Sequence, residues 1–256
     1  MKGMKCFVYL VILIFSLGAY AIESAAQNLI ATCADDPGAP GSYMLTANLS
    51  SSGNCLEVGA ANVTIDLNGF QIEKTAGGGL TAGIKFLNSL LDTQGITVRN
   101  GTIKGFSFGI NLSGGRSCLV ENISARDNTS AGIRVDSGCT VRNNIAVDNL
   151  GSGIVASEAN IISGNTAYSN DLDGIDVGSD NLISNNNASL NARDGISTNG
   201  FGFQNLISGN TTSGNGQDGI QIDCPSNLTG NIAQGNGVMN VNLIGLGCKR
   251  FGDNLF

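Results

Sequence analysis

The chain has 256 residues and a formal net charge of −7 at pH 7, with 37 glycines, three prolines, and neither histidine nor tryptophan. An acidic chain without basic clusters is a poor match for nucleic acid, and for anionic lipid or sulfated sugar held by charge alone. The lack of histidine excludes a Ser-His catalytic pair, a histidine base and a histidine metal cluster.

The first 26 residues predict a secretory signal peptide. Lys2 and Lys5 precede the apolar stretch Phe7–Leu17, and small residues allow cleavage after Ala21 or after Ala26. The alternative is a membrane anchor, but the apolar run is shorter than the roughly 20 residues that span a bilayer. We therefore expect a secreted or periplasmic protein without a membrane span once the signal is removed.

Residues 27–57 are expected to form an N-terminal lead-in and cap, and residues 248–256 a C-terminal tail. Between them, over residues 58–247, a Gly-Ile pair recurs every 21 to 26 residues, and Asn240-Val241 continues the series. This periodicity predicts about eight coils of a repeat protein. The pairs begin at Gly83, Gly109, Gly132, Gly153, Gly174, Gly195 and Gly219.

A second apolar position follows the first at a constant offset, thirteen residues before the next Ile or Val of the first pattern. Because segments such as Ile175–Val177 alternate with period two, each unit is expected to hold three very short strands separated by turns. Strands this short need partners, which stacking supplies at ~4.8 Å per coil. The second positions are Val120, Val141, Ile162, Ile183, Ile207 and Leu228.

Asparagine forms two columns in this register, with a column of small residues beside them. Asparagine tolerates the left-handed backbone of a turn, which we expect at these positions, and its side chain can bond the equivalent amide one coil away, so buried ladders are expected. One column is Asn128, Asn149, Asn170, Asn191, Asn215 and Asn236. The other is Asn144, Asn165, Asn186, Asn210 and Asn231, with Asn122 one residue early; the small residues are Ala125, Ala146, Ala167, Ala188, Thr212 and Ala233.

The six cysteines that remain after export allow fifteen pairings in principle. We expect Cys224–Cys248 at the C-terminal end and Cys33–Cys55 in the lead-in. Cys118 and Cys139 occupy equivalent positions 21 residues apart, so their Cα atoms should lie within disulfide range. Their side chains would run parallel, which leaves open whether they bond.

Two segments carry a resemblance to a known family. "NVTIDLNGFQI" (residues 62–72) and "GITVRNGTIKG" (residues 95–105) resemble the first coils of the right-handed parallel β-helix repeat family, and "PGSYMLTANLS" (residues 40–50) resembles the lead-in of exported members. The family includes polysaccharide-lyase-like and copper-maturation-like proteins. The resemblance covers about residues 40–247 and implies that the first sheet and the turn before it line a polysaccharide cleft.

A column of acids is the candidate metal site. Asp173, Asp194 and Asp218 directly precede Gly-Ile in three successive coils, so stacking would place them about 5 Å apart. Carboxylates at that spacing repel, and a cation would offset the repulsion. Calcium accepts such oxygen ligands, and the resemblance implies calcium in lyases of this fold. The alternative is that each Asp merely caps a turn.

Four further residues are candidates for substrate binding. Asp176 points outward from the first sheet, Arg193 is the nearest base to the acids, and Phe201 and Phe203 lie in a unit three residues longer than usual. Exposed aromatics would stack on sugar rings, but both phenylalanines are alternatively expected to cover the core. Arg134 occupies the outward site of the first sheet and could reach a cleft, but the basic set to which it belongs is alternatively expected to be solvated surface charge. The set lies in earlier coils and consists of Arg99, Lys104, Arg116, Arg126, Arg134 and Arg142.

These observations predict an exported β-helix that binds or processes polysaccharide, with calcium as its only expected cofactor and no catalytic residue assigned. The rival is a non-catalytic surface or periplasmic scaffold or adhesion protein. Regular coils with few long turns favour the rival, because clefts are usually walled by longer loops.

Overall fold

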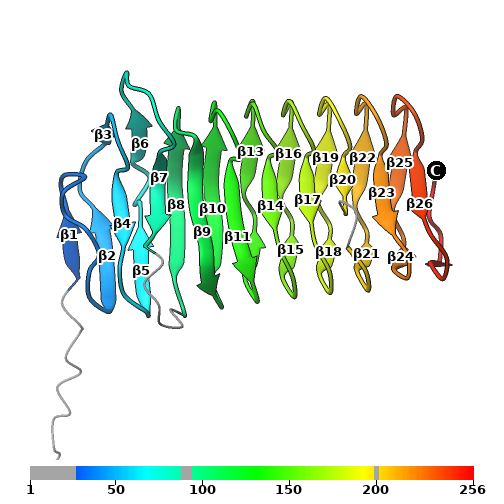
Figure 1. Cartoon of the computed structure of the whole chain (residues 1–256), viewed down its shortest axis with the longest axis horizontal. Coiled ribbons are helices and arrows are strands. Elements are labelled where there is room, and N and C mark those ends of the chain that lie inside the picture. The colour runs from blue at the N-terminus through cyan, green and yellow to red at the C-terminus, as the bar shows by residue number, and fades with distance from the viewer. Residues whose placement is uncertain (1–26, 88–93, 199–201) are drawn as a thin grey trace, which may run out of the picture.

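The computed structural model describes residues 27–87, 94–198 and 202–256, which form a parallel β-helix with its coils stacked along one axis (Figure 1). All named strand pairs are parallel, and partners commonly lie 21 residues apart. The expected all-β solenoid is thereby confirmed. The predicted signal peptide and Phe201 lie outside the described residues, and among these residues there is no helix with the length and apolarity to cross a bilayer.

Nine strands form the first sheet, one from each coil. The Gly-Ile pattern missed the first of them, because Cys55-Leu56 stands where the later coils have Gly-Ile, and Leu56 pairs in register with Ile84. The strands are β4 (Leu56–Val58), β7 (Ala82–Phe86), β9 (Phe108–Arg116), β11 (Ile133–Ser137), β14 (Ile154–Ala156), β17 (Ile175–Val177), β20 (Ile196–Ser197), β23 (Ile220–Asp223) and β26 (Val241–Ile244).

The other two strands of each coil form the second and third sheets. They are joined into one 18-stranded sheet because β8 (Thr97–Lys104) and β10 (Leu119–Arg126) run through both without a break. The second sheet also contains β1 (Asn28–Ile30), β2 (Gly41–Leu45), β5 (Val63–Asp66), β12 (Thr140–Arg142), β15 (Ile161–Ser163), β18 (Leu182–Ser184), β21 (Leu206–Ser208), β24 (Asn227–Thr229) and β27 (Lys249–Phe251). The third contains β3 (Leu49–Ser51), β6 (Gln71–Lys74), β13 (Ile145–Val147), β16 (Thr166–Tyr168), β19 (Asn187–Ser189), β22 (Thr211–Ser213) and β25 (Ile232–Gln234).

The core consists of aliphatic columns that run along the inside of the solenoid. Ile162, Ile183 and Ile207 pair in register and are fully buried, as expected. Burying one such side chain is worth roughly 1.5–3 kcal/mol. The expected small column is also fully buried: Ala125, Ala146, Ala167, Ala188, Thr212 and Ala233.

Both expected asparagine columns are buried ladders. In the ladder that contains Asn165, the side-chain amide donates 2.9 Å to Asn186 Oδ1, and the backbone N–H of Asn165 donates to the same oxygen. The ladder that contains Asn170 repeats this geometry towards Asn191. Asn122 is no rung, because it is exposed and bonds Asn100 instead.

A third ladder was not predicted. It joins Asn160, Asn181 and Asn205, and Cys139 continues it by donating its backbone N–H to Asn160 Oδ1. The left-handed backbone that we expected at the ladder asparagines occurs one residue earlier, as at Ser169. The turn therefore bends before the asparagine, and the asparagine turns inward to bond the next coil.

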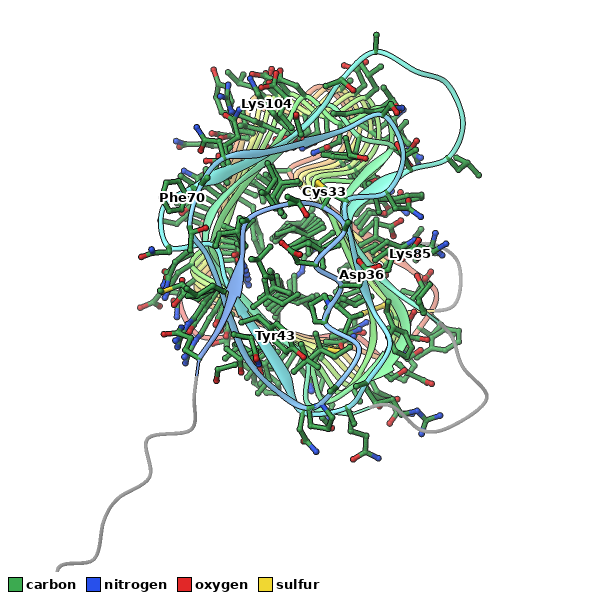
Figure 2. All side chains as sticks on the ribbon, turned by 90° about the vertical axis from the view of Figure 1, so that its left-hand side faces the viewer. Cys33, Asp36, Tyr43, Phe70, Lys85 and Lys104 are labelled. Atoms are coloured by element: carbon green, nitrogen blue, oxygen red, sulfur yellow. A yellow bond between two sulfur atoms is a disulfide. The ribbon has the colours of Figure 1, made fainter. Side chains whose placement is uncertain are left out.

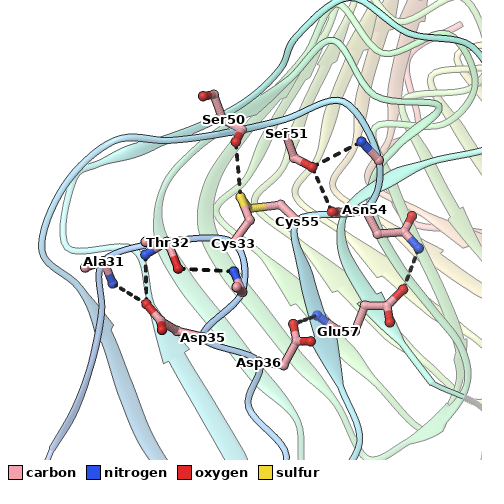
Figure 3. Close-up of a disulfide and its surroundings, with 12 residues drawn as sticks. Ala31, Thr32, Cys33, Asp35, Asp36, Ser50, Ser51, Asn54, Cys55 and Glu57 are labelled. Atoms are coloured by element: carbon pink, nitrogen blue, oxygen red, sulfur yellow. Dashed lines mark hydrogen bonds between the residues drawn. A yellow bond between two sulfur atoms is a disulfide. The ribbon is translucent and has the colours of Figure 1, made fainter.

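The N-terminal end of the solenoid is covered by the loop that follows β1 (Figure 3). The Asp36 carboxylate accepts the backbone N–H of Glu57 at the outer edge of β4, 2.9 Å away. Cys33 and Cys55 form a disulfide with their Cα atoms 4.5 Å apart, which ties this loop to the first coil. An edge strand that would otherwise present unpaired groups is thus closed.

The expected Cys224–Cys248 disulfide is also present, with a Cα–Cα distance of 4.8 Å, whereas Cys118 and Cys139 are free and buried. The Cys118 backbone N–H lies 3.3 Å from Cys139 Sγ, which takes the position of an asparagine oxygen in the third ladder. Hydrogen bonding between the thiols raises the pKa of Cys118 and lowers the pKa of Cys139.

We predict that peptide mapping of denatured, unreduced protein after alkylation will find label on Cys118 and Cys139. The other four cysteines of the described residues should appear as two disulfide-linked pairs, since each pair spans one coil at a Cα distance that suits a disulfide. Alkylated Cys224 or Cys248 would contradict the pairing at the C-terminal end.

Candidate functional site

The outer face of the first sheet carries one in-register column of side chains, with one residue from each coil. Neighbouring strands place these residues ~4.8 Å apart. The column reads Glu57, Lys85, Asn111, Arg134, Val155, Asp176, Ser197, Gln221 and Asn242. Figure 2 looks along the axis from the N-terminal end, and Lys85 lies on the outside of the coil.

Two hollows lie on this face. The β14–β17 hollow has a volume of about 360 Å³ and is lined by Val155, Ala156, Ser157, Glu158, Asp176, Val177, Gly178 and Ser179. The β7–β9 hollow has a volume of about 200 Å³ and is lined by Asn54, Leu80, Thr81, Ala82, Lys85, Phe108 and Asn111. The structure therefore places Asp176, expected to bind substrate, in a surface depression.

The longer unit near Phe203 limits this face at the later coils. Ser197 continues the column but is fully buried, and Asp223 accepts the backbone N–H of Gly202. The backbone N–H of Phe203 donates to Ser179 Oγ on the rim of the β14–β17 hollow, and the Phe203 side chain is 40% exposed. Phe203 is therefore near Asp176 and available to a ligand.

Arg193 lies apart from these hollows. It precedes β20 in the turn, whereas the β14–β17 hollow lies along and beyond the ends of its strands. Its guanidinium is 3.6 Å from Asp173 Oδ2, in the one ion pair that the described residues show for the acidic column. The structure thus separates Arg193 from Asp176.

Asp173, Asp194 and Asp218 stack before the first sheet, as expected, but they are buried. Asp173 Oδ1 accepts the backbone N–H of Asp194, and Asp194 Oδ1 accepts that of Asp218. Asp194 is 0% exposed. Each side chain turns inward to accept the backbone N–H of the next coil, so these acids form a buried ladder at the turn.

This acidic ladder does not fit a calcium ion. The three Oδ1 atoms accept backbone N–H groups, and Asp218 Oδ2 accepts the Asn242 amide at 2.7 Å. Among the described residues, Asp194 Oδ2 has no hydrogen-bond partner, and it is buried. Calcium takes six to eight oxygen ligands, and in residues 27–87, 94–198 and 202–256 no three acids, cysteines or histidines are placed to hold a metal. We expect no calcium-dependent heat in calorimetric titration; saturable binding lost in Asp194→Asn would restore the metal site.

Burial raises the pKa of Asp194, and the facing carboxylates of Asp173 and Asp218 raise it further, against the lowering effects of the Asp218 backbone N–H and of Arg193. The folded state therefore holds this proton more tightly than the unfolded state does. As pH rises above about 4, the usual Asp value, the free energy of unfolding should fall for this reason.

Replacement of Asp194 by Asn should remove this loss, so the stability of the variant relative to wild type should increase as pH rises from 4 to 7. Urea unfolding at several pH values measures the difference. The control is Asp171→Asn in the equivalent turn of the preceding coil, where the side chain is exposed and a small difference is expected. A constant difference for Asp194→Asn would contradict the effect of burial.

Four members of the basic set are paired on the outer surface. Arg99 binds Asp66 at 2.9 Å and Arg142 binds Glu121 at 2.7 Å. Lys104 and Arg126 pair with Glu73 and Asp127, whereas within the described residues Arg134 shows no ion pair and lies 5.9 Å over the Phe108 ring. The basic set is therefore mostly surface charge, as expected. Arg116 at the end of β9 is likewise exposed, and Arg134 is the member that lies in the outward column of the first sheet.

Sequence analysis missed the β7–β9 hollow. Lys85 follows Gly83-Ile84 at the same offset at which Arg134 and Asp176 follow their own Gly-Ile pairs. That offset was the available signal for Lys85. Phe108 directly precedes its Gly-Ile pair, the position that Asp173, Asp194 and Asp218 fill in later coils, so no repeated aromatic pattern marks this half-buried residue.

A family model described as the right-handed β-helix region matches residues 47–180. The enzymatically active domain of bacteriophage CBA120 tailspike protein 2 aligns with a TM-score of 0.69 at 14% identity, over 88% of this chain and 42% of that one. The A-module of the Azotobacter vinelandii mannuronan C-5 epimerase AlgE4 aligns with a TM-score of 0.58 at 13% identity, over 91% and 89%.

The periplasmic alginate epimerase AlgG aligns with a TM-score of 0.52 at 15% identity, over 84% of this chain and 62% of that one. At these identities the similarities show the fold alone. This chain spans less than half of the tailspike domain. No curated protein matches it.

Proposed function

Because this chain belongs to the right-handed β-helix family, we propose that it is an exported protein that binds a linear polysaccharide along the outer face of its first sheet. The observation that carries the proposal is the in-register column on this face, with its two hollows. A row of mostly polar side chains at intervals of one coil suits a polymer, because successive units of the polymer meet equivalent positions on successive coils.

Two further observations support the proposal. Structurally similar proteins include epimerases of the polysaccharides mannuronan and alginate. Two disulfides are typical of an oxidising compartment, which agrees with the signal peptide that the sequence predicts.

In the site, Asp176 and Ser157 of the β14–β17 hollow are the groups placed to bond sugar hydroxyls. Phe203, whose backbone N–H bonds Ser179 of this hollow, would contact the apolar face of a sugar ring. Arg193 is not part of this site, because its guanidinium pairs with Asp173 of the buried acidic ladder. The ligand is thus expected to lie across the strands and parallel to the solenoid axis.

The test is a binding screen of the full exported protein against immobilised neutral and acidic polysaccharides, with bovine serum albumin as the protein control. We expect saturable binding to at least one linear polymer and competition by its soluble fragments. Absence of binding to every polymer would overturn the proposal.

A non-catalytic scaffold or adhesion role is the second candidate, favoured by the small hollows and the regular 21-residue coils. Release of reducing ends or of unsaturated products in the same screen separates processing from binding. Binding without turnover would identify a carbohydrate-binding scaffold.

A further inference from the structure

We infer that the early coils of the first sheet select a polysaccharide with anionic groups about 10 Å apart, at a segment formed by Lys85, Asn111 and Arg134. This inference rests on the proposed function and names the class of its ligand. The three residues occupy successive column positions on β7, β9 and β11. Two coil intervals therefore separate Lys85 from Arg134, or about 10 Å between backbones.

Each residue of this donor segment has only hydrogen-bond donors available to a ligand. The Lys85 ammonium and the Arg134 guanidinium carry no acceptor. Asn111 has one, but its Oδ1 already accepts both the backbone N–H and the hydroxyl of Ser113, at 3.1 and 2.8 Å. Its amide N–H groups are what remain for a ligand, so the segment suits carboxylate or sulfate oxygens rather than a neutral hydroxyl array.

The two cations are also uncommitted within the described part of the chain. Lys85 and Arg134 form no ion pair there, in contrast to Arg99 and Arg142 on the second sheet. Glu57 precedes Lys85 in the column, but its carboxylate accepts the Asn54 amide at 2.6 Å. A ligand anion can therefore bind these unpaired cations without breaking an existing salt bridge.

Phe108 in the β7–β9 hollow connects the positions of these two cations. Phe108 and Lys85 line this hollow, and the Arg134 guanidinium lies over the Phe108 ring. Thr81 also lines it, and its hydroxyl is buried with no hydrogen-bond partner among the described residues. In this order of groups, one charged sugar unit would pair with Lys85, an uncharged unit would lie over Phe108, and a second charged unit would pair with Arg134.

The arrangement also reconciles an anionic ligand with the acidic chain. The column changes from donors at Lys85, Asn111 and Arg134 to apolar at Val155 and acidic at Asp176. The overall charge of −7 is therefore no guide to this surface. An anionic polymer is drawn to the early coils and repelled from the later ones, which fixes its position along the face.

The experiment compares three probes by calorimetric titration at low salt: a neutral linear glucan, a polymer with a carboxylate on every sugar, and one in which uronate alternates with an uncharged sugar. The alternating polymer should bind most tightly. Lys85→Gln and Arg134→Gln should each weaken it about tenfold, as loss of one charge-assisted bond predicts. The matched control Lys74→Gln on β6 removes the same charge elsewhere and should change nothing.

Two further measurements vary the sodium chloride concentration and add free glucuronate as a competitor. Binding should weaken as salt rises, and free glucuronate should compete poorly, because a single anion can occupy only one of the two cation positions. Equal affinity for the neutral glucan, or unchanged affinity in both Gln variants, would overturn the inference while leaving polysaccharide binding intact. Failure to bind any of the three polymers would remove the proposed function as well.

Discussion

Replacement of Asn165 by Leu is expected to lower the free energy of unfolding by about 3–4 kcal/mol. The side chain is 1% exposed, and its Oδ1 accepts both the backbone N–H and the amide of Asn144. Its own amide donates to Val141 O and to Asn186 Oδ1. Leucine removes four hydrogen bonds and leaves buried partners unsatisfied, at about 1–3 kcal/mol for each group that finds no substitute.

Urea unfolding measures the effect, with Asn187→Leu as the matched control. Asn187 directly follows the ladder residue Asn186 but is exposed, so the same change should cost under about 0.5 kcal/mol. Equal unfolding midpoints for the two variants would show that the ladder contributes no more than a surface amide.

Replacement of Gly174 by Ala is expected to cost about 2–4 kcal/mol. A Cβ there would lie 2.6 Å from Gly195 O in the next coil and 2.6 Å from the Asn191 amide. Neither atom is the end of a flexible chain, since one is backbone and the other is fixed in the ladder, so the coils must separate to admit the methyl group. Overpacking of this kind typically costs 1–3 kcal/mol and occasionally more.

Gly53→Ala is the control for this prediction. Nothing lies within 4 Å of a Cβ at Gly53, so unfolding curves of that variant should match wild type. A Gly174→Ala protein as stable as the Gly53→Ala protein would contradict the close coil contact. The same contact explains the glycine of the Gly-Ile pattern, because Gly132, Gly153 and Gly195 also face the carbonyl of the next coil within 3 Å.

The fold was predictable because stacking turns sequence intervals into spatial contacts. Residues 21 apart meet in register, so Ile162 and Ile183 could be paired from spacing alone. The coil that begins with Cys55-Leu56 was not predicted, because its residues differ from the Gly-Ile pattern. The third ladder was not predicted for the same reason, since Cys139 occupies a column that asparagine fills in later coils.

The site was less predictable, because burial in a turn depends on the next coil. An Asp before a strand normally remains in water, yet Asp194 turns inward, where it accepts the Asp218 backbone N–H. The donor character of Asn111 is hidden for a similar reason: it follows from Ser113, whose hydroxyl could have pointed elsewhere. Spacing locates a column, whereas the hydrogen bonds within it decide what the column offers a ligand.

The most direct test of polysaccharide binding along the first sheet is the affinity of two single-site variants for a polymer that the wild type binds. Val155→Glu places a charge at the centre of the column, and Ser163→Glu places the same charge on the outer face of the second sheet. We predict at least a tenfold loss of affinity for Val155→Glu and wild-type affinity for Ser163→Glu, with both proteins folded by circular dichroism. Loss in Ser163→Glu alone, or equal affinity of both variants, would contradict the account.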